Sequence, residues 1–173
     1  MTHRIRSRVV KFLGQLLSYG ALLLIVSLAM DYWRGRDLPQ VALPHATFED
    51  IAGQDFLLTE LSHQQLVVVY FWATWCGPCK VSTPSVTKLA HSYPVVSIAL
   101  QSESTEALQN YLSQNAIAFP VVNDIDSTIA GEWGVAATPT ILFIHKGKVV
   151  ANTSGVSFYP GLWLRAWWLS RFS

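Results

Sequence analysis

Residues 66–79 read LVVVYFWATWCGPC, and this stretch predicts the centre of the fold. Its first seven residues are all aliphatic or aromatic, which is typical of a strand buried on both faces of a sheet. Two cysteines, Cys76 and Cys79, follow shortly after it. We expect a helix from about Cys76 to His91. The stretch therefore predicts a buried strand that leads into a cysteine pair at the start of a helix.

Cys76 and Cys79 are the only cysteines in the protein. A pair separated by two residues where a strand gives way to a helix indicates a redox dithiol. Cys76 would lie at the helix N-terminus, where unpaired N–H groups and the helix dipole favour negative charge. In such a position the pKa of a thiol falls from about 8.5 to roughly 3.5–7.5, so the reactive thiolate is populated. Cys79, one turn further in, is expected to be more buried and to resolve a mixed disulfide.

Two other interpretations of the cysteine pair remain open, a static disulfide and half of a zinc site. A structural zinc site needs four ligands. The five histidines show no paired spacing; they are His3, His45, His63, His91 and His145. We therefore expect no metal site and no bound cofactor.

The chain after the cysteine pair alternates between strand and helix patterns. Strands are expected at 56–59, 95–100 and 119–122, with N-cap chemistry for helices at 102–106 and at Asp126-Ser127. Residues 141–145 and 148–151 flank Lys146-Gly147, which indicates a hairpin, and Pro160 suits the first turn of a last helix to about Leu169. This order predicts an α/β fold with a central mixed sheet, partly parallel and partly antiparallel.

Residues 71–79, FWATWCGPC, with Pro84 five residues after the second cysteine, resemble the thioredoxin superfamily. Thr138-Pro139-Thr140, ahead of a strand, resembles its cis-proline loop, and Gly155-Val156 resembles the third loop of its redox face. The similarity covers most of residues 40–170. The resemblance implies a thioredoxin-like fold, in which a central mixed sheet is flanked by helices.

The resemblance also implies a cis Thr138–Pro139 bond, although a trans proline at a strand start would be the ordinary expectation. It further implies a shallow substrate groove beside the catalytic pair Cys76 and Cys79. The groove residues would be Trp75, Pro78, Thr138, Pro139, Gly155 and Val156. Taken singly, each of these six also has an explanation in packing or in a turn.

Three positions near the dithiol bear on how Cys79 loses its proton. Thioredoxins usually carry a buried Asp where this chain has Tyr70, and many membrane-anchored relatives carry a Glu where it has Ser82. The base for Cys79 is therefore not identified. Lys80 could bias thiolate formation or could simply be solvated. We hypothesise that the Tyr70 hydroxyl binds a water molecule near Cys79.

The N-terminal part of the chain has the pattern of a membrane anchor. Residues 1–36 carry six basic side chains against one acid, for a net charge of +5, and residues 12–30 are uncharged. A membrane-spanning helix needs about 20 mostly apolar residues, and a basic flank stays in the cytoplasm. A cleaved signal peptide and a buried soluble helix are the alternatives. We expect a cytoplasmic tail at 1–11, a transmembrane anchor at 12–30, a linker at 31–44 and a thioredoxin-like domain at 45–173.

The rest of the chain, residues 37–173, carries six basic and ten acidic side chains, for a net charge of −4. The protein as a whole is 51% hydrophobic and 13% charged. This composition excludes a disordered chain, which could not bury enough apolar surface. A nucleic-acid-binding protein would need a clustered basic surface, so we expect no nucleic acid partner.

The last predicted helix is unusually aromatic between residues 162 and 169, LWLRAWWL. Trp163 and Trp167 are spaced i, i+4, as are Leu164 and Trp168, so they form a wide apolar face. Packing of this helix against the sheet would account for the apolar face. Contact with the bilayer surface or with a membrane partner is the alternative, because tryptophan is favoured at that interface.

The anchor and the stretch from Asn123-Asp124 to Val135, ahead of the Thr138-Pro139 pair, resemble the membrane-anchored TlpA, ResA and CcmG type of thioredoxin-like protein. Within this type the resemblance is greatest to the suppressor-of-copper-sensitivity D proteins. This implies a reductase of selected protein disulfides, anchored in the bacterial inner membrane with its domain in the periplasm and recharged by a transmembrane electron donor of the DsbD type. This resemblance implies a role in cytochrome c maturation or in copper tolerance. A dithiol oxidase or isomerase is an alternative, and so is a copper-handling protein that binds Cu(I) through the reduced dithiol.

Overall fold

The computed structural model describes residues 47–173 and, in the N-terminal part, residues 15, 18, 19 and 22, which are helical. The chain divides into two compact units, Met1–Asp37 and Leu38–Ser173. In the described part of the chain, no helix combines the length and the apolarity needed to cross a bilayer.

Most of the predicted N-terminal segments lie outside the described residues. This holds for the basic tail at 1–11, for the linker at 31–44 and for the predicted span at 12–30 apart from the four helical positions. The predicted membrane anchor therefore stays a prediction, and the fold below is that of residues 47–173.

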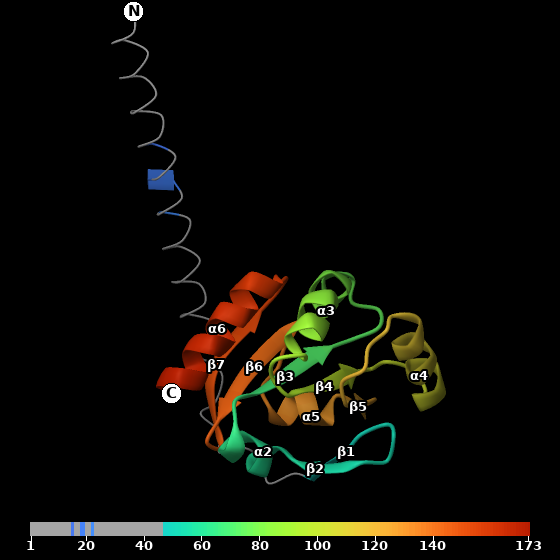
Figure 1. Cartoon of the computed structure of the whole chain (residues 1–173). Helices are drawn as coiled ribbons and strands as arrows, with labels where there is room; N and C mark the ends of the chain where they lie inside the picture. Colours follow the sequence, from blue (N-terminus) through green and yellow to red (C-terminus); the bar gives the residue numbers. More distant parts are fainter. Residues whose placement is uncertain (1–14, 16–17, 20–21, 23–46) are drawn as a thin grey trace, which may run out of the picture. The chain divides into compact units, whose positions relative to one another are not determined.

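A five-stranded mixed sheet forms the centre of the domain, in the order β5-β4-β3-β6-β7 (Figure 1). β3 pairs parallel with β4 and antiparallel with β6, so the predicted mixture of parallel and antiparallel pairing is confirmed. The elements run in the order β1 (Thr47–Glu49), β2 (Asp55–Leu57), α2 (Leu58–Gln64), β3 (Val67–Trp72), α3 (Gly77–Leu89), β4 (Val95–Leu100), α4 (Thr105–Gln114), β5 (Val121–Asp124), α5 (Thr128–Glu132), β6 (Thr140–His145), β7 (Lys148–Ser154) and α6 (Tyr159–Phe172).

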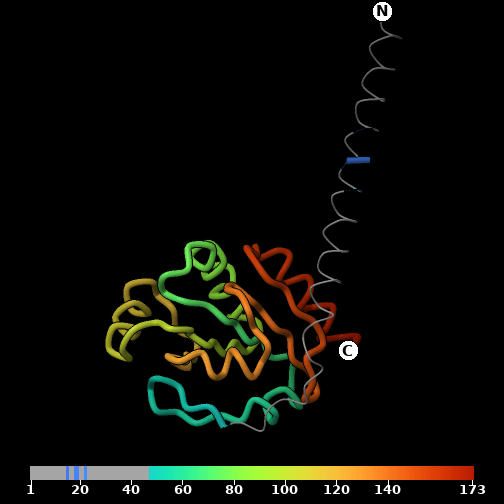
Figure 2. Tube along the Cα trace, turned by 180° about the vertical axis from the view of Figure 1, so that it is seen from behind, coloured from blue at the N-terminus to red at the C-terminus, as the bar shows by residue number. Residues whose placement is uncertain are grey.

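The central strand β3 is buried along its whole length, as its apolar run predicts. Alternate residues face opposite sides of the sheet, so β3 contributes to two cores. Val68, Tyr70 and Trp72 join a core formed with α3, α4 and α6. Val67, Val69 and Phe71 join a second core with β1, α2 and α5. Figures 1 and 2 show α3 and α6 on one face of the sheet, with α5 and the β1–β2 hairpin on the other.

Several predicted elements differ from the structure. The second hairpin strand, expected at 148–151, is β7 and continues to Ser154. The strand expected at 56–59 ends at Leu57, because Leu58 starts α2 and packs into the second core. The strand expected at 119–122 is β5, which begins two residues later. Pro120, which precedes it, has no N–H to donate to a ladder, although its carbonyl accepts from Ser97. The last helix continues past Leu169 to Phe172.

Asp124 caps the N-terminal end of α5, a role that the sequence pattern assigned to Asp126-Ser127. The buried Asp124 carboxylate accepts hydrogen bonds from the backbone of Ile129 at 3.1 Å and Ala130 at 2.9 Å. Asp126 adds one bond from Thr128, whereas Ser127 makes no capping bond. These bonds satisfy N–H groups that would otherwise lack partners.

Candidate active site

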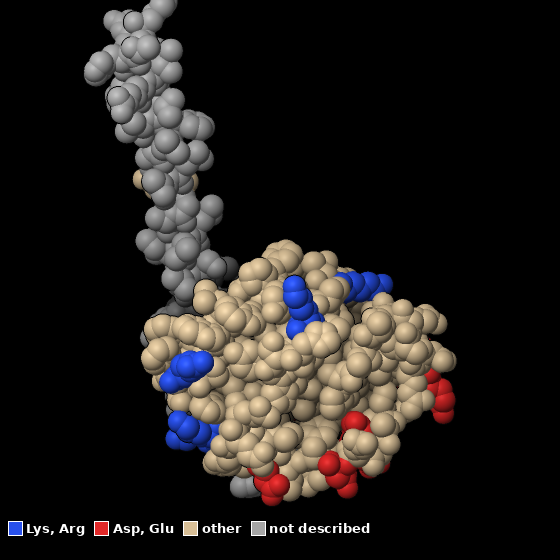
Figure 3. All heavy atoms as spheres, viewed as in Figure 1, with Lys and Arg blue, Asp and Glu red and all other residues tan. Residues whose placement is uncertain are grey.

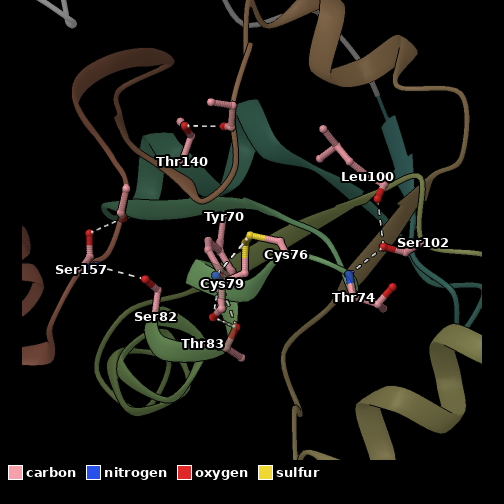
Figure 4. The surroundings of a disulfide bond; sticks show 12 residues. Tyr70, Thr74, Cys76, Cys79, Ser82, Thr83, Leu100, Ser102, Thr140 and Ser157 are labelled. Carbon is pink, nitrogen blue, oxygen red and sulfur yellow. Dashed lines mark hydrogen bonds between the residues drawn. A yellow bond between two sulfur atoms is a disulfide. The ribbon is translucent and has the colours of Figure 1, made fainter.

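Cys76 and Cys79 form a disulfide at the N-terminus of α3, directly after β3, with an S–S distance of 2.07 Å (Figure 4). Cys76 is the N-cap residue, and Pro78 lies in the first turn, where a helix needs no N–H from it. The backbone N–H of Cys79 donates to Cys76 Sγ at 3.2 Å. Once the disulfide is reduced, this bond and the helix terminus favour the thiolate form of Cys76. The predicted order of burial holds, since Cys76 is 4% exposed and Cys79 is 1% exposed.

Residues in the loop after β4 form hydrogen bonds with Thr74 and Trp75, which precede Cys76. The indole N–H of Trp75 donates to the Gln101 carbonyl at 3.2 Å, although the Trp75 side chain is 61% exposed. The Thr74 N–H donates to the hydroxyl of Ser102, which in turn donates to the Leu100 carbonyl (Figure 4). The indole hydrogen bond therefore holds the exposed ring of Trp75, the residue before Cys76, against the loop after β4.

The Thr138–Pro139 peptide bond is cis, which confirms the expectation drawn from the family resemblance. Gly155 lies next to this bond, since its N–H donates to the Pro139 carbonyl at 2.8 Å. The φ angle of Gly155 is +93°, a conformation that side chains with a Cβ rarely adopt. Glycine has no Cβ and adopts this conformation without strain, which explains why it occupies the position.

Ser82 connects α3 to the loop that contains Gly155 and Val156. Its hydroxyl is fully buried and accepts a hydrogen bond from the Ser157 N–H at 3.0 Å (Figure 4). A continuous set of bonds therefore runs from α3 through Ser157 and Gly155 to Pro139. The sequence predicts neither this role of Ser82 and Ser157 nor the bond between Ser102 and Thr74, because isolated serines carry no pattern that identifies their partners.

The structure gives the six predicted groove residues different degrees of exposure. Trp75, Pro78 and Val156 are exposed, and Thr138 and Gly155 are half-buried. Pro139 is buried, so it shapes the loop backbone and presents little surface of its own. The hydrogen bonds above connect the Gly155 loop both to the Pro139 loop and to the helix that carries the cysteines.

Residues 35–153 match the AhpC/TSA family. The chain belongs to this family. A thioredoxin-like protein from Haemophilus influenzae is 33% identical over 166 residues, which cover 95% of this chain and 99% of that protein. The thiol-disulfide oxidoreductase ResA of Bacillus thuringiensis is 35% identical over 117 residues, covering 65% of this chain and 67% of ResA.

Among solved structures, a secreted Mycobacterium tuberculosis disulfide oxidoreductase homologous to E. coli DsbE superimposes with a TM-score of 0.60 at 24% identity. The match covers 70% of this chain and 94% of that one. The thioredoxin-like α/β fold expected from the sequence is therefore confirmed. As an AhpC/TSA-family chain with a Cys-Gly-Pro-Cys disulfide, the protein is a thioredoxin-like disulfide oxidoreductase.

Tyr70 occupies the position where the family resemblance predicts an acid, and its hydroxyl bonds to protein atoms. It donates to the Cys79 carbonyl at 3.4 Å and shares a 3.1 Å hydrogen bond with Thr83 Oγ1. Thr83 itself donates to the Cys79 carbonyl at 2.8 Å. Burial raises the pKa of Tyr70 to about 12, partly offset by the hydrogen bond to Thr83. Tyr70 therefore braces the backbone of Cys79 as a neutral phenol.

Lys80 is exposed, which favours the interpretation that its ammonium group is simply solvated. In residues 47–173, no group of three or more His, Cys, Asp or Glu side chains could hold a metal ion. The described site contains two bonded sulfur atoms, and that of Cys76 accepts the Cys79 backbone N–H.

Proposed function

We propose that this protein is a membrane-anchored periplasmic thiol–disulfide oxidoreductase that reduces selected protein disulfides. The observation that carries the proposal is the Cys76–Cys79 disulfide at the start of α3, with Cys76 Sγ facing the Cys79 N–H. This arrangement favours Cys76 as the attacking thiolate and Cys79 as the resolving thiol. Both residues are the proposed catalytic pair.

The reduced enzyme would act in two exchange steps. The Cys76 thiolate attacks one sulfur of a substrate disulfide, forms a mixed disulfide and releases the other substrate sulfur as a thiolate, which takes up a proton. Cys79 then loses its proton and attacks Cys76 Sγ, so the second substrate sulfur leaves. Two electrons pass to the substrate, and the enzyme ends as the disulfide seen in the structure.

The proposed substrate surface consists of Trp75, Pro78, Thr138, Pro139, Gly155 and Val156. Three of these side chains are exposed, and the loops that carry the last four are hydrogen-bonded together and to α3. An extended segment of a disulfide-containing protein would lie against the Thr138 backbone. Such a short, mostly apolar surface suits selected clients better than bulk reduction.

The proposed location rests on charge and on the relatives. Residues 12–30 would cross the bacterial inner membrane, and the basic flank at 1–11 would keep the N-terminus in the cytoplasm. The linker at 31–44 would then lead to a periplasmic domain at 45–173. The secreted M. tuberculosis relative supports an extracytoplasmic domain.

Because the periplasm is oxidising, a reductase there needs a supply of electrons. We assign that role to a transmembrane donor of the DsbD type, whose dithiol would reduce the Cys76–Cys79 disulfide. A Gly-Pro pair separates the cysteines, which is similar to reducing thioredoxins. The reduction potential is expected near the thioredoxin value of about −270 mV, and well below the value of about −120 mV for DsbA.

A trapping experiment tests the proposal. In Cys79→Ala, the mixed disulfide on Cys76 cannot be resolved, so the variant expressed in a bacterial envelope should accumulate client proteins that dithiothreitol releases. The matched control is the double variant Cys76→Ala/Cys79→Ala, which should capture none. Equal recovery from both variants would contradict the exchange mechanism.

The redox equilibrium with glutathione distinguishes a reductase from a dithiol oxidase or isomerase. A potential close to that of DsbA, together with rapid oxidation of a reduced protein and poor reduction of insulin, would favour the oxidase. A low potential with insulin reduction would support the proposal.

A copper-handling role is the second candidate, because two thiolates at the Cys76 and Cys79 positions form a soft ligand pair for Cu(I). In the described part of the chain no cluster of further ligands would complete a larger site. Stoichiometric Cu(I) binding by the reduced protein, without disulfide exchange, would favour this role and the suppressor-of-copper-sensitivity D assignment.

A further inference from the structure

Helix α6 exposes a continuous apolar surface that the redox chemistry does not use. Leu162 and Ala166 bury the opposite side of the helix in the core shared with α3. Because a helix turns by 100° per residue, the exposed residues of α6 occupy about half of its circumference. The exposed large apolar side chains are Trp163, Leu164, Trp167, Trp168 and Phe172, and Phe158 extends them just before the helix.

Four of these side chains form two aromatic pairs along the helix. The Trp163 and Trp167 rings stack with centroids 6.5 Å apart, and the Trp168 and Phe172 rings lie 4.4 Å apart. Both pairs are spaced i, i+4, which places each pair on adjacent turns. The exposed fractions reach 56% for Trp168 and 65% for Phe172. A monomeric protein in water rarely exposes so many contiguous aromatic rings.

Basic and acidic side chains lie on different sides of the domain, and the apolar surface of α6 lies on the basic side. All six basic side chains of residues 47–173 belong to α3, to the β6–β7 hairpin or to α6; they are Lys80, Lys88, Lys146, Lys148, Arg165 and Arg171. The nine acidic side chains of the same residues lie on or beside β1, β2, α2, α4, β5 and α5. Figure 3 shows the Lys and Arg side chains around the part of the surface that carries α6 and α3, and Asp and Glu along the opposite edge.

Two lysines contact α6 or the residue that follows it. Lys88 Nζ lies 4.4 Å from the ring centroid of Tyr159 at the start of the helix, and Lys146 Nζ donates to the Ser173 carbonyl beyond its end. Arg171 is the one charged residue on the exposed side of α6, which contains no acid. Positive charge therefore brackets the aromatic surface at both ends.

We infer that α6 docks flat on an anionic lipid surface, with its tryptophan rings at headgroup depth. Tryptophan is enriched at the membrane interface, and an apolar helix face flanked by Lys and Arg binds anionic lipids. Two copies joined through α6 would instead bring Arg171 and the lysines at the helix ends of one copy close to those of the other, which like-charge repulsion opposes. The docking would orient the domain on the bilayer, beyond any tethering by residues 12–30.

Spin labelling of the full chain tests the inference. In the oxidised protein both native cysteines are in the disulfide, so a cysteine introduced by Leu164→Cys is the single free thiol that accepts a nitroxide. The labelled chain is mixed with lipid nanodiscs of phosphatidylcholine, with and without phosphatidylglycerol. The matched control is Glu132→Cys on α5, which is exposed on the other face of the sheet.

With phosphatidylglycerol, the label at 164 should gain collisions with oxygen and lose collisions with water-soluble nickel, while the label at 132 stays in water. High salt, which screens charge, should reverse the change. The charge reversal Lys148→Glu/Arg171→Glu should prevent it, and Lys148→Gln/Arg171→Gln should weaken it, with thermal unfolding used to confirm that both variants fold.

Three outcomes would overturn the inference. The label at 164 could remain as accessible to nickel as the label at 132. It could enter the lipid equally well without phosphatidylglycerol, which would remove the role of charge. It could also lose both oxygen and nickel collisions, which would show that protein covers α6, either a second copy or an acidic partner. None of these results would alter the trapping experiment with Cys79→Ala, so the two proposals fail separately.

Discussion

At the scale of single residues, Tyr70 shows how a buried phenol takes the place of an expected acid. Its hydroxyl reaches the Cys79 carbonyl and Thr83, not a sulfur atom. These direct bonds give the hydroxyl a role of its own, and the water-mediated role hypothesised from the sequence stays a prediction. We therefore regard Tyr70 as a positioning residue that holds the first turn of α3.

The raised pKa of Tyr70 predicts a loss of stability in alkali. Below pH 10 the Tyr70 phenol is neutral in both the folded and the unfolded protein, but between pH 10 and about 12 it ionises only in the unfolded chain. The free energy of unfolding should therefore fall as pH rises through this range, by up to about 3 kcal/mol from this group. Tyr70→Phe should lose about 1 kcal/mol at neutral pH and show a shallower alkaline fall.

Urea unfolding of both proteins between neutral pH and about pH 12 measures the difference. Other tyrosines and lysines ionise in both proteins, so the wild-type value minus the Tyr70→Phe value isolates the phenol. A difference that does not change with pH would contradict the pKa assignment.

Trp75 is the exposed ring closest in sequence to Cys76, and the Gln101 carbonyl holds its indole. If clients contact this ring, Trp75→Ala should lower kcat/KM for a protein disulfide about tenfold, a typical loss for an aromatic contact. The rate at which iodoacetamide alkylates Cys76 in the reduced protein should stay unchanged, because the Cys79 N–H donor remains. A parallel loss of both rates would show that Trp75 acts on the thiol itself.

At the scale of elements, the hydrogen bond between Ser82 and Ser157 joins α3 to the β7–α6 loop. Ser82→Ala would leave a buried N–H without a partner, and this costs about 1–3 kcal/mol of unfolding free energy. Ser85→Ala, on the same helix and only partly buried, is the matched control and should change stability by less than about 0.5 kcal/mol. Urea denaturation compares the two, and equal losses would show that the loop bond contributes nothing.

At the scale of the whole molecule, β3 gives alternate side chains to two cores, so the two faces of the sheet should unfold together. Leu108 lies in the core with α3 and α6, and Leu142 lies in the other core. Each Leu→Ala change should cost about 2–5 kcal/mol, and exposed Leu164→Ala should cost little. Near- and far-ultraviolet circular dichroism should report one transition for every variant. Two separate transitions in either core variant would contradict the coupling.

The sequence predicts some elements more accurately than others. The β3 run and β4 are predicted almost to the residue, because a continuous apolar stretch bounded by turn residues has few other interpretations. The sequence does not predict β1, and it places Leu58 and Thr59, the first residues of α2, at the end of a strand, because short segments have weak patterns and tertiary packing decides their conformation. The lysine-glycine turn was recognised, and both of its residues have positive φ.

By itself, the sequence determined the redox chemistry and the class of fold. The cysteine pair and its proline lie within one short stretch, and the fold class follows from local strand and helix patterns along the chain, so neighbouring residues specify both. Only the tertiary structure decided what surrounds the pair: the Ser82–Ser157 bond, the Ser102 anchor and the neutral Tyr70 beside Cys79. It also decided that the tryptophans of α6 stay exposed among the cations. The physical reason is that these contacts join residues far apart in the chain, whose pairing depends on the packing of the whole sheet.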